Sequence, residues 1–361
     1  MVIFGAGASY DSSPEFHPAP EAKELGSRLW APPLTCDLFR DRHSQFGDII
    51  KRYPRLSGIL PFLRQPQGGR SIEEQLELYQ NESSTDSERI RQLLSVRYYV
   101  HDLFHLISEN WLKETSGVTN YATLIDQIRH RNTTGEPVCL VTFNYDLLLD
   151  RAVFPFGLAS FPIERHFDAH KMFKVFKPHG SVDWARLAGP RQQLKENLRA
   201  VRLAPQQLIE RADDFAPTGD FVRANATNPH QIFQHEAPIF PAIAIPVQTK
   251  TEDFFEWPDS HRKYFEELLP QIKRILIIGW QGKEAHFLQL LRAKLRTGGV
   301  TQLEYLQVVG KEYRDATEIA KNFKTGIDRI VWKSEAAPQG FSHYVREELV
   351  DFFFQAGVNL D

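Results

Sequence analysis

Polar and glycine-rich turns in this sequence come directly after apolar runs, and their residue types suit the binding of a nucleotide. The first turn is Gly5-Ala6-Gly7-Ala8-Ser9-Tyr10, which follows the apolar run Val2-Ile3-Phe4. Gly5 and Gly7 lack a Cβ, so the chain can turn sharply and a pyrophosphate can approach main-chain N–H donors. A dinucleotide is therefore the first ligand to consider, although short Gly-Ala turns after buried strands also occur for purely structural reasons.

The second polar turn is Thr142-Phe143-Asn144-Tyr145-Asp146, at the end of an apolar run over 137–143. A helix is expected to start at Leu147, so Thr142, Asn144 and Asp146 would lie at the carboxyl end of a strand, where open α/β sheets bind ligands. The side-chain amide of Asn144 would supply both a donor and an acceptor. Asp146 could instead cap the following helix, and Thr142 could be an ordinary β-branched strand residue.

Two more turns of this kind occur later in the chain. Lys177-Pro178-His179-Gly180-Ser181 follows a predicted strand over 173–176, and the ring of His179, with an ordinary pKa of about 6.5, can accept a proton near neutral pH. Gly279-Trp280-Gln281-Gly282 follows 274–278, the clearest buried strand of the chain. This last turn is a second candidate strand–glycine–helix site for a phosphate or a ribose.

The elements between these turns alternate. Helical periodicity runs from Ser71 to about Glu114 with a break at 81–85, and a third helix is expected from a cap at 120–123 to His130. Towards the C-terminus the pattern predicts strands at 303–309 and 327–332 and helices starting near Glu284 and over 315–323 and 344–354.

This order of elements predicts an α/β fold with a doubly wound, Rossmann-like parallel sheet. We expect a single domain over 1–361 that contains an inserted helical module at 40–134. Residues 185–248 are rich in Arg, Gln and Pro and have little periodicity, so a small loop-rich insertion is expected there.

The composition excludes several classes of protein. With 361 residues, 42% of them hydrophobic, the chain has the composition of an ordinary globular protein. Its net charge of −3 creates no overall positive potential that would attract nucleic acid. No apolar run approaches the roughly 20 residues that span a bilayer, and the start is too short and glycine-rich for a signal peptide, so a cytoplasmic protein is expected. The first strand begins so early that the natural start could lie a few residues upstream.

Only two cysteines occur, Cys36 and Cys139, which excludes a disulfide framework and a four-thiolate zinc site. Both are expected to be buried and reduced. His101 and His105 stand four apart on a predicted helix, but the glutamate of a zinc-protease motif is missing, so no metal site is expected.

Two features argue against an ordinary dehydrogenase. No third glycine follows Gly7 at the expected spacing, and Pro14, Pro18 and Pro20 prevent a long helix after the first turn. The polar, proline-rich segment from Ser9 to Pro32 is long enough either to cover a bound ligand as a lid or to be a plain surface loop.

Taken together in this order, the four turns resemble those of the sirtuin-like superfamily, in particular its bacterial zinc-free branch associated with phage defence. The resemblance covers nearly the whole chain. Residues 185–248 contain no cysteine, whereas protein-deacylating sirtuins carry a four-cysteine zinc ribbon there. Glu284 stands where relatives often have aspartate, although an acid at a helix N-terminus is also expected on its own.

The resemblance implies a role for each turn. Gly5 to Tyr10 resembles the cofactor-binding turn, Thr142 to Asp146 the nicotinamide-side motif, and 279–281 the ribose-binding turn. By this resemblance Asn144 would hold the nicotinamide ribose or the attacking water, and Asp146 would accept the carboxamide N–H. His179 would be the general base.

The activity that the resemblance implies is hydrolysis of NAD+ to nicotinamide and ADP-ribose, without a metal, as a defence that depletes NAD+ during phage infection. It also implies restraint by a homo-oligomer, a lid, or a separately encoded partner such as an ATPase, an Argonaute-like protein or a phage trigger protein. Two alternatives remain: a module that senses NAD+ or ADP-ribose, and an NAD-dependent deacylase or ADP-ribosyltransferase. The choice between NAD+ and NADP+ stays open, because no acidic residue marks the end of an identifiable second strand.

Overall fold

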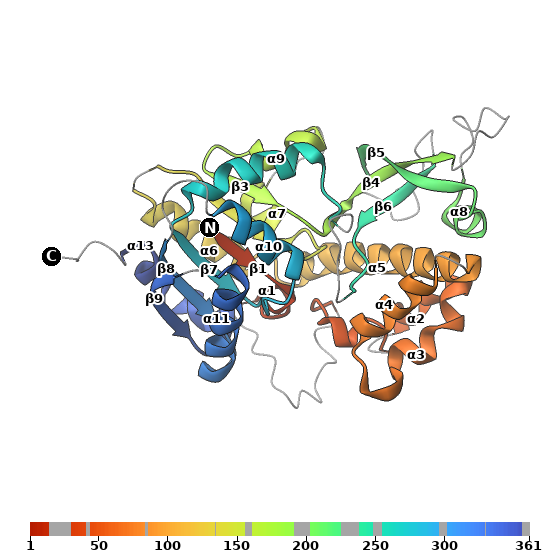
Figure 1. Ribbon diagram of the computed structural model, residues 1–361, viewed down its shortest axis with the longest axis horizontal. Helices are drawn as coiled ribbons and strands as arrows, with labels where there is room; N and C mark the ends of the chain where they lie inside the picture. Colours follow the sequence, from red (N-terminus) through yellow and green to blue (C-terminus); the bar gives the residue numbers. More distant parts are fainter. Residues whose placement is uncertain are drawn as a thin grey trace.

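The computed structural model describes residues 1–13, 30–40, 44–83, 86–133, 135–155, 161–190, 203–224, 238–247, 255–295, 302–328 and 330–355. The predicted lid segment is described only at its two ends, because 14–29 lie outside these ranges. A large parallel sheet with helices on both faces occupies one side of Figure 1, and a helical module with a small antiparallel sheet occupies the other.

The central sheet has six parallel strands in the order β3-β2-β1-β7-β8-β9. Its strands are β1 (Val2–Phe4), β2 (Val138–Thr142), β3 (Phe173–Phe176), β7 (Arg274–Ile278), β8 (Gln302–Val309) and β9 (Ile330–Ala337). β2 and β3 lie successively on one side of β1, and β7, β8 and β9 lie successively on its other side. The predicted doubly wound α/β sheet is confirmed, with its switch in strand order between β1 and β7.

Alternating side chains of the strands enter two separate hydrophobic clusters, one on each face of the sheet. Ile3 and Ile277 pack with α9 (Asp259–Leu268), α10 (Ala285–Lys294) and α11 (Tyr313–Ile327). Phe4 and Ile278 pack with residues of α6 (Asn120–Arg131), α7 (Leu148–Val153), α12 (Gly340–Arg346) and α13 (Val350–Gln355). Burial on both faces explains why these strands are apolar runs instead of alternating ones.

The helical module contains α2 (Ser44–Lys51), α3 (Leu60–Arg64), α4 (Ile72–Glu82) and the long α5 (Ser87–Glu114). The periodicity predicted α4 and α5, whereas α2 and α3 lie before the segment in which it was recognised. Ser71 and Glu74 form a capping box at the start of α4. The expected cap of α6 at Asn120 is wrong by one residue: Thr119 accepts from the N–H of Ala122, while Asn120 donates to Asp11 and Ser342.

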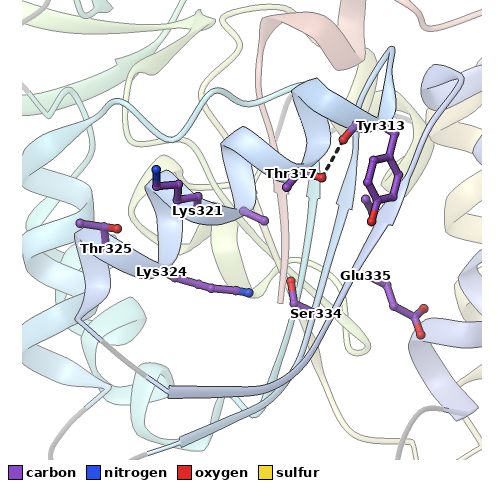
Figure 2. A pocket seen from close by; sticks show the side chains of 9 residues that line it. Tyr313, Thr317, Lys321, Lys324, Thr325, Ser334 and Glu335 are labelled. Atoms are coloured by element: carbon purple, nitrogen blue, oxygen red, sulfur yellow. Dashed lines mark hydrogen bonds between the residues drawn. The ribbon is translucent and has the colours of Figure 1, made fainter.

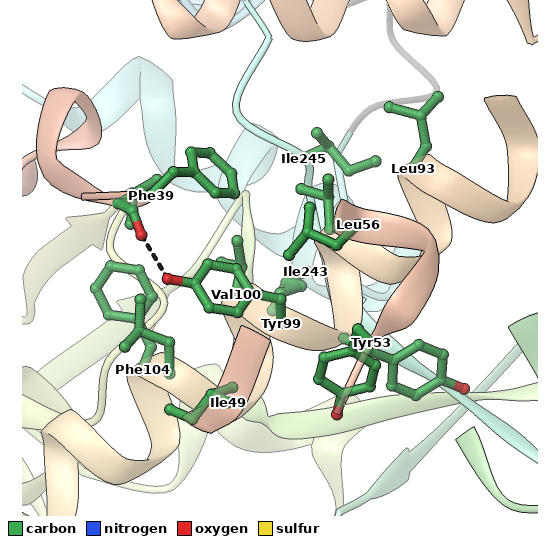
Figure 3. Close-up of a cluster of buried hydrophobic side chains, with 14 of the residues drawn as sticks. Phe39, Ile49, Tyr53, Leu56, Leu93, Tyr99, Val100, Phe104, Ile243 and Ile245 are labelled. Atoms are coloured by element: carbon green, nitrogen blue, oxygen red, sulfur yellow. Dashed lines mark hydrogen bonds between the residues drawn. The ribbon is translucent and has the colours of Figure 1, made fainter. Parts of the chain in front are cut away.

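The segment expected to be rich in loops contains a three-stranded antiparallel sheet in the order β5-β4-β6, and the first strand begins before it. Its strands are β4 (Gly180–Pro190), β5 (Phe215–Arg223) and β6 (Ile239–Ile243), with α8 (Pro205–Glu210) between β4 and β5. Ile243 and Ile245 pack among Leu56, Leu93 and Tyr99 of the helical module (Figure 3), so these strands gain stability from tertiary packing instead of from a clear local pattern.

Three expectations about local structure are corrected. The expected last strand over 327–332 starts later, because Ile327 belongs to the buried face of α11, which ends at the left-handed residue Asp328. The expected helix over 344–354 is two short helices, α12 and α13, since Glu348 has a φ of 50° and interrupts the helical path. Cys36 is exposed, on a short 3₁₀ turn, whereas Cys139 on β2 is buried as expected and burial raises its pKa to about 12.

Candidate functional site

The turns after β1 and β7 touch each other through their backbones at the switch in strand order. Phe4 and Ile278 are paired in register, the N–H of Gly5 donates to the Ile278 carbonyl at 3.0 Å, and that of Gly7 donates to the Gly279 carbonyl at 3.0 Å. Gly279 has a φ of 63°, and a Cβ there would lie 2.1 Å from the Ala8 nitrogen. Glycine is therefore required at this contact by both conformation and space.

This contact uses two of the main-chain donors that were expected to face a pyrophosphate. Gly5 and Gly7 donate inside the protein, and the following helix α1 (Ala6–Tyr10) has only five residues. Pyrophosphate binding by these two N–H groups would require the β1 and β7 turns to separate.

The side chain of Asn144 is fixed by the turn after β1. Its Nδ2 donates to the Gly5 carbonyl at 2.9 Å, and lies 2.8 Å from Ser9 Oγ and 3.1 Å from Tyr121 Oη. A carbonyl can only accept, so the amide nitrogen must face Gly5. Within the described part of the chain the Oδ1 atom has no hydrogen-bond partner, so it is the atom that can accept from a ribose hydroxyl or a water.

Thr142 and Ser9 help to hold this segment. The Oγ1 of Thr142 accepts from the Asn144 N–H at 3.1 Å, which turns the chain out of β2. Ser9 Oγ donates to Asp146 Oδ2 at 2.7 Å and lies 2.9 Å from Tyr121 Oη. Ser9, Asn144 and Asp146 are 2%, 7% and 2% exposed, so the network is closed to water apart from the Asn144 amide.

Asp146 is bound on both carboxylate oxygens. Besides Ser9, it accepts from the N–H of Leu148 at 3.1 Å, two residues later, at the start of α7. Asp146 thus bonds the first N–H of α7, although Leu147 occupies the N-cap position and the helix has no side-chain cap. Burial raises the pKa of Asp146 above its ordinary value, against the opposing charge of Lys177.

A buried ion cluster lies beneath this turn. Lys177 is fully buried and donates to the Asp146 carbonyl at 2.6 Å and to Asp150 Oδ2 at 2.7 Å, while His166 Nε2 lies 2.9 Å from Asp150 Oδ1. Burial alone would raise the pKa of Asp150, but Lys177 and His166 outweigh it and the pKa is lowered. The cluster ties the end of β3 to α7 and so supports the turn that carries Asn144.

His179 reaches the same segment through its aromatic neighbours. Its ring lies 4.8 Å from the ring of Phe143 and 6.4 Å from that of Tyr145, which flank Asn144 in the chain. Gly180 has a φ of 79°, and a Cβ there would lie 1.8 Å from the Ala242 carbonyl oxygen. This tight turn into β4 leaves His179 only 4% exposed.

The turn after β7 adds an aromatic wall. The Trp280 ring stacks on Phe143 at 5.2 Å between centroids, and its Nε1 donates to Glu284, the first residue before α10. Glu284 therefore stands at a helix N-terminus, as the simpler expectation held, but its carboxylate bonds Trp280 instead of capping the helix. Gln281 is exposed and Tyr10 is half-buried.

The structure thus brings the four predicted turns together. The turns at 5–10 and 279–281 are in contact through their backbones, and the Asn144 amide bonds the Gly5 carbonyl. The ring of His179 joins them by its contact with Phe143. Sequence reasoning missed the support provided by Tyr121, Lys177, Asp150 and His166. Lys177 did carry a signal, since a lysine directly after an apolar strand must find a partner when the strand is buried.

The two cavities described lie away from this cluster. One, of about 340 Å³, is formed by α11 and β9, where Lys321, Lys324 and Ser334 line it (Figure 2). The other, of about 410 Å³, lies between the helical module and the small sheet. In the residues that the structure describes, no group of three or more His, Cys, Asp or Glu could hold a metal, and no helix is long and apolar enough to cross a membrane.

No protein-family model matches this chain, and no curated protein matches it either.

Proposed function

We propose that this protein is an NAD+ hydrolase that cleaves the nicotinamide–ribose bond and acts in anti-phage defence by depleting NAD+. The observation that carries the proposal is the hydrogen bond from Asn144 to the Gly5 carbonyl, which joins the end of β2 to the glycine turn after β1. It leaves the Asn144 Oδ1 pointing away from the network at the carboxyl edge of a parallel sheet, beside the switch in strand order, where α/β folds bind nucleotides.

The chemistry suits these residues. Water adds to the anomeric carbon of the ribose, the electron pair of the broken bond leaves with nicotinamide as a neutral pyridine, and the proton of the water passes to a base. Because the leaving group needs no protonation, the site has mainly to position the water and the ribose. Asn144 would orient the ribose or the water through Oδ1, and His179 would accept the proton.

The burial of the site bears on its control. Asn144, Asp146 and His179 are each less than 8% exposed, so the turns after β1 and β7 must move before a dinucleotide reaches all three. This supports an enzyme that is restrained until an oligomer or a separate partner opens it. It equally favours the second candidate, a module that senses NAD+ or ADP-ribose.

NAD+ consumption by the purified protein tests the proposal, with nicotinamide and ADP-ribose quantified and no acyl-lysine or protein acceptor present. We expect wild type to release both products, as the assembled oligomer or with a candidate partner added, and His179→Asn to release them at least a hundredfold more slowly under the same conditions. His130→Asn, on the exposed face of α6, is the matched control and should keep full activity. Folding of each variant is checked by its thermal unfolding.

Other outcomes separate the alternatives. Binding of NAD+ without turnover, in the assembled oligomer and with candidate partners added, would favour the sensing module. Turnover that appears only with an acceptor would favour a deacylase or an ADP-ribosyltransferase. Equal rates for wild type and His179→Asn would remove His179 from the mechanism.

A further inference from the structure

The cavity between the helical module and the small sheet has the size and lining of a ligand site. Its volume of about 410 Å³ falls in the range of small-molecule pockets, roughly 300–1,000 Å³. Apolar side chains form most of the wall, with Leu93 and Leu94 from α5, Phe215 from β5, Phe240 from β6, and Ile245 just beyond β6. Leu93 and Ile245 are both seen in Figure 3.

One side of this cavity carries positive charge that the described residues only partly neutralise. Arg97 lines the cavity, and its Nη1 lies 3.0 Å from Glu256 Oε1. Arg186 Nη1 lies 3.2 Å from the other oxygen of the same carboxylate. Two guanidinium groups thus share one carboxylate, which is 6% exposed, and the charges of these three described side chains sum to +1. The Nε and Nη2 donors of Arg97 have no hydrogen-bond partner within the described residues.

A second polar group in the lining is also unsatisfied. The Oε1 atom of Gln80, at the end of α4, is buried and has no hydrogen-bond partner within the described residues. A buried acceptor without a partner destabilises the protein, and a bound donor would remove this cost. The charge of Arg97, the apolar wall and the Gln80 acceptor together favour a ligand that carries a negative charge, an apolar part and a hydrogen-bond donor.

The cavity wall is continuous with the turn that carries His179. Ile245 follows Ala244, whose N–H donates to the His179 carbonyl at 2.9 Å and whose carbonyl accepts from Tyr145 Oη at 2.7 Å. Glu256, the partner of Arg97, donates its N–H to the Pro178 carbonyl at 2.9 Å. A ligand that moves Ile245 or Arg97 therefore acts on main chain directly bonded to 178 and 179.

We propose that this cavity binds a small amphipathic carboxylate with a hydrogen-bond donor on its apolar part, and that its binding is sensed at the His179 turn. The carboxylate pairs with Arg97, the apolar part fills the space between α5 and the small sheet, and the donor meets Gln80. The binding of this ligand does not depend on the proposed hydrolase function. Only the catalytic significance of a change at His179 rests on that function.

Binding is measured by calorimetry with indole-3-butyrate, whose indole N–H is the donor, on the full chain. We expect a dissociation constant below about 1 mM and at least tenfold weaker binding of the uncharged indole-3-butyramide. Leu94→Trp fills the cavity and should abolish binding, and Arg97→Gln should remove the preference for the acid. Arg91→Gln is the matched control, because Arg91 lies on the same helix but pairs with Asp213.

Sensing at His179 is read from the imidazole resonances of the protein labelled in histidine, with the His179 signal assigned by its loss in His179→Asn. This signal should shift on adding indole-3-butyrate to wild type and stay unchanged in Leu94→Trp. Binding that is equal for acid and amide, or that survives Leu94→Trp, would overturn the site. Specific binding with no shift of the His179 signal would overturn the coupling. Neither readout uses NAD+, so a failure here is distinct from a failure of the hydrolase proposal.

Discussion

The side-chain amide of Asn144 donates to the main-chain carbonyl of Gly5 at 2.9 Å, across 139 positions of the sequence. This bond joins two neighbouring parallel strands just beyond their carboxyl ends. It selects an amide over a carboxylate, because only a donor can face the Gly5 oxygen.

Asn144→Asp should therefore destabilise the protein. The substitution places an oxygen against the Gly5 carbonyl in a site that is only 7% exposed, and we expect a loss of about 1–3 kcal/mol in the free energy of unfolding. Urea denaturation at neutral pH measures it. Asn132→Asp is the control, since Asn132 also donates to a carbonyl, that of Glu136, but in an exposed turn. If the two variants lost the same free energy of unfolding, the buried hydrogen bond would contribute no more to stability than the exposed one.

Gly279→Ala should disrupt the contact between the β1 and β7 turns. A Cβ at this position would lie 2.1 Å from the Ala8 nitrogen at a φ of 63°, so we expect a loss of at least about 3 kcal/mol. Gly282→Ala has a similar φ of 68° but meets nothing closer than 3.9 Å, and should lose only about 1–2 kcal/mol. Chemical denaturation of the two variants side by side compares them, and a smaller loss at Gly279 than at Gly282 would contradict the contact.

Lys177→Met should be among the most damaging single substitutions near the site. It leaves the carboxylate of Asp150 buried beside the ring of His166 and without the charge of Lys177, and removing one member of a buried ion pair costs about 3–5 kcal/mol. The double variant Lys177→Met/Asp150→Asn should recover part of this loss, which a double-mutant cycle detects. Strictly additive losses would mean that the pair is not coupled. Arg129→Met, which breaks the exposed pair with Asp126, should cost less than about 1 kcal/mol.

Stability should fall as the pH drops below about 6.5, because of two buried histidines. Burial lowers the pKa of His105 to about 4 and that of His261 to about 3. The unfolded chain then binds more protons between these values and the ordinary 6.5, so the stabilisation is complete above about pH 6.5 and is lost as the pH falls.

Each histidine contributes a slope of about 1 kcal/mol per pH unit between pH 6 and 5. His105→Phe should remove one such contribution without losing a bond at Nδ1, for which the described residues offer no partner. Denaturation series at pH 7, 6 and 5 measure the slope. A slope in His105→Phe equal to that of wild type would refute the assignment.

Much of the fold could be predicted from local patterns. The strand at 173–176 coincides with β3 and that at 274–278 with β7, because apolar runs of strand length bounded by turns have few other conformations available. The register of Phe4 with both Thr142 and Ile278 then brings the three turns to one level of the sheet, so the predicted site residues meet because the strands are parallel.

The sequence by itself determined the parallel sheet and the four turns at its edge, since burial on both faces leaves continuous apolar runs in the strands, each ended by a polar or glycine-rich turn. Only the tertiary structure decided which partners the polar groups of these turns bond. The N–H groups of Gly5 and Gly7 donate to the β7 turn, the Asn144 nitrogen faces inward, and Lys177 finds Asp150 beneath the turn. Each of these hydrogen bonds has a partner that is distant in the sequence. A donor bonds the acceptor that packing brings within about 3 Å, and the residues next to the donor in the chain do not determine which acceptor that is.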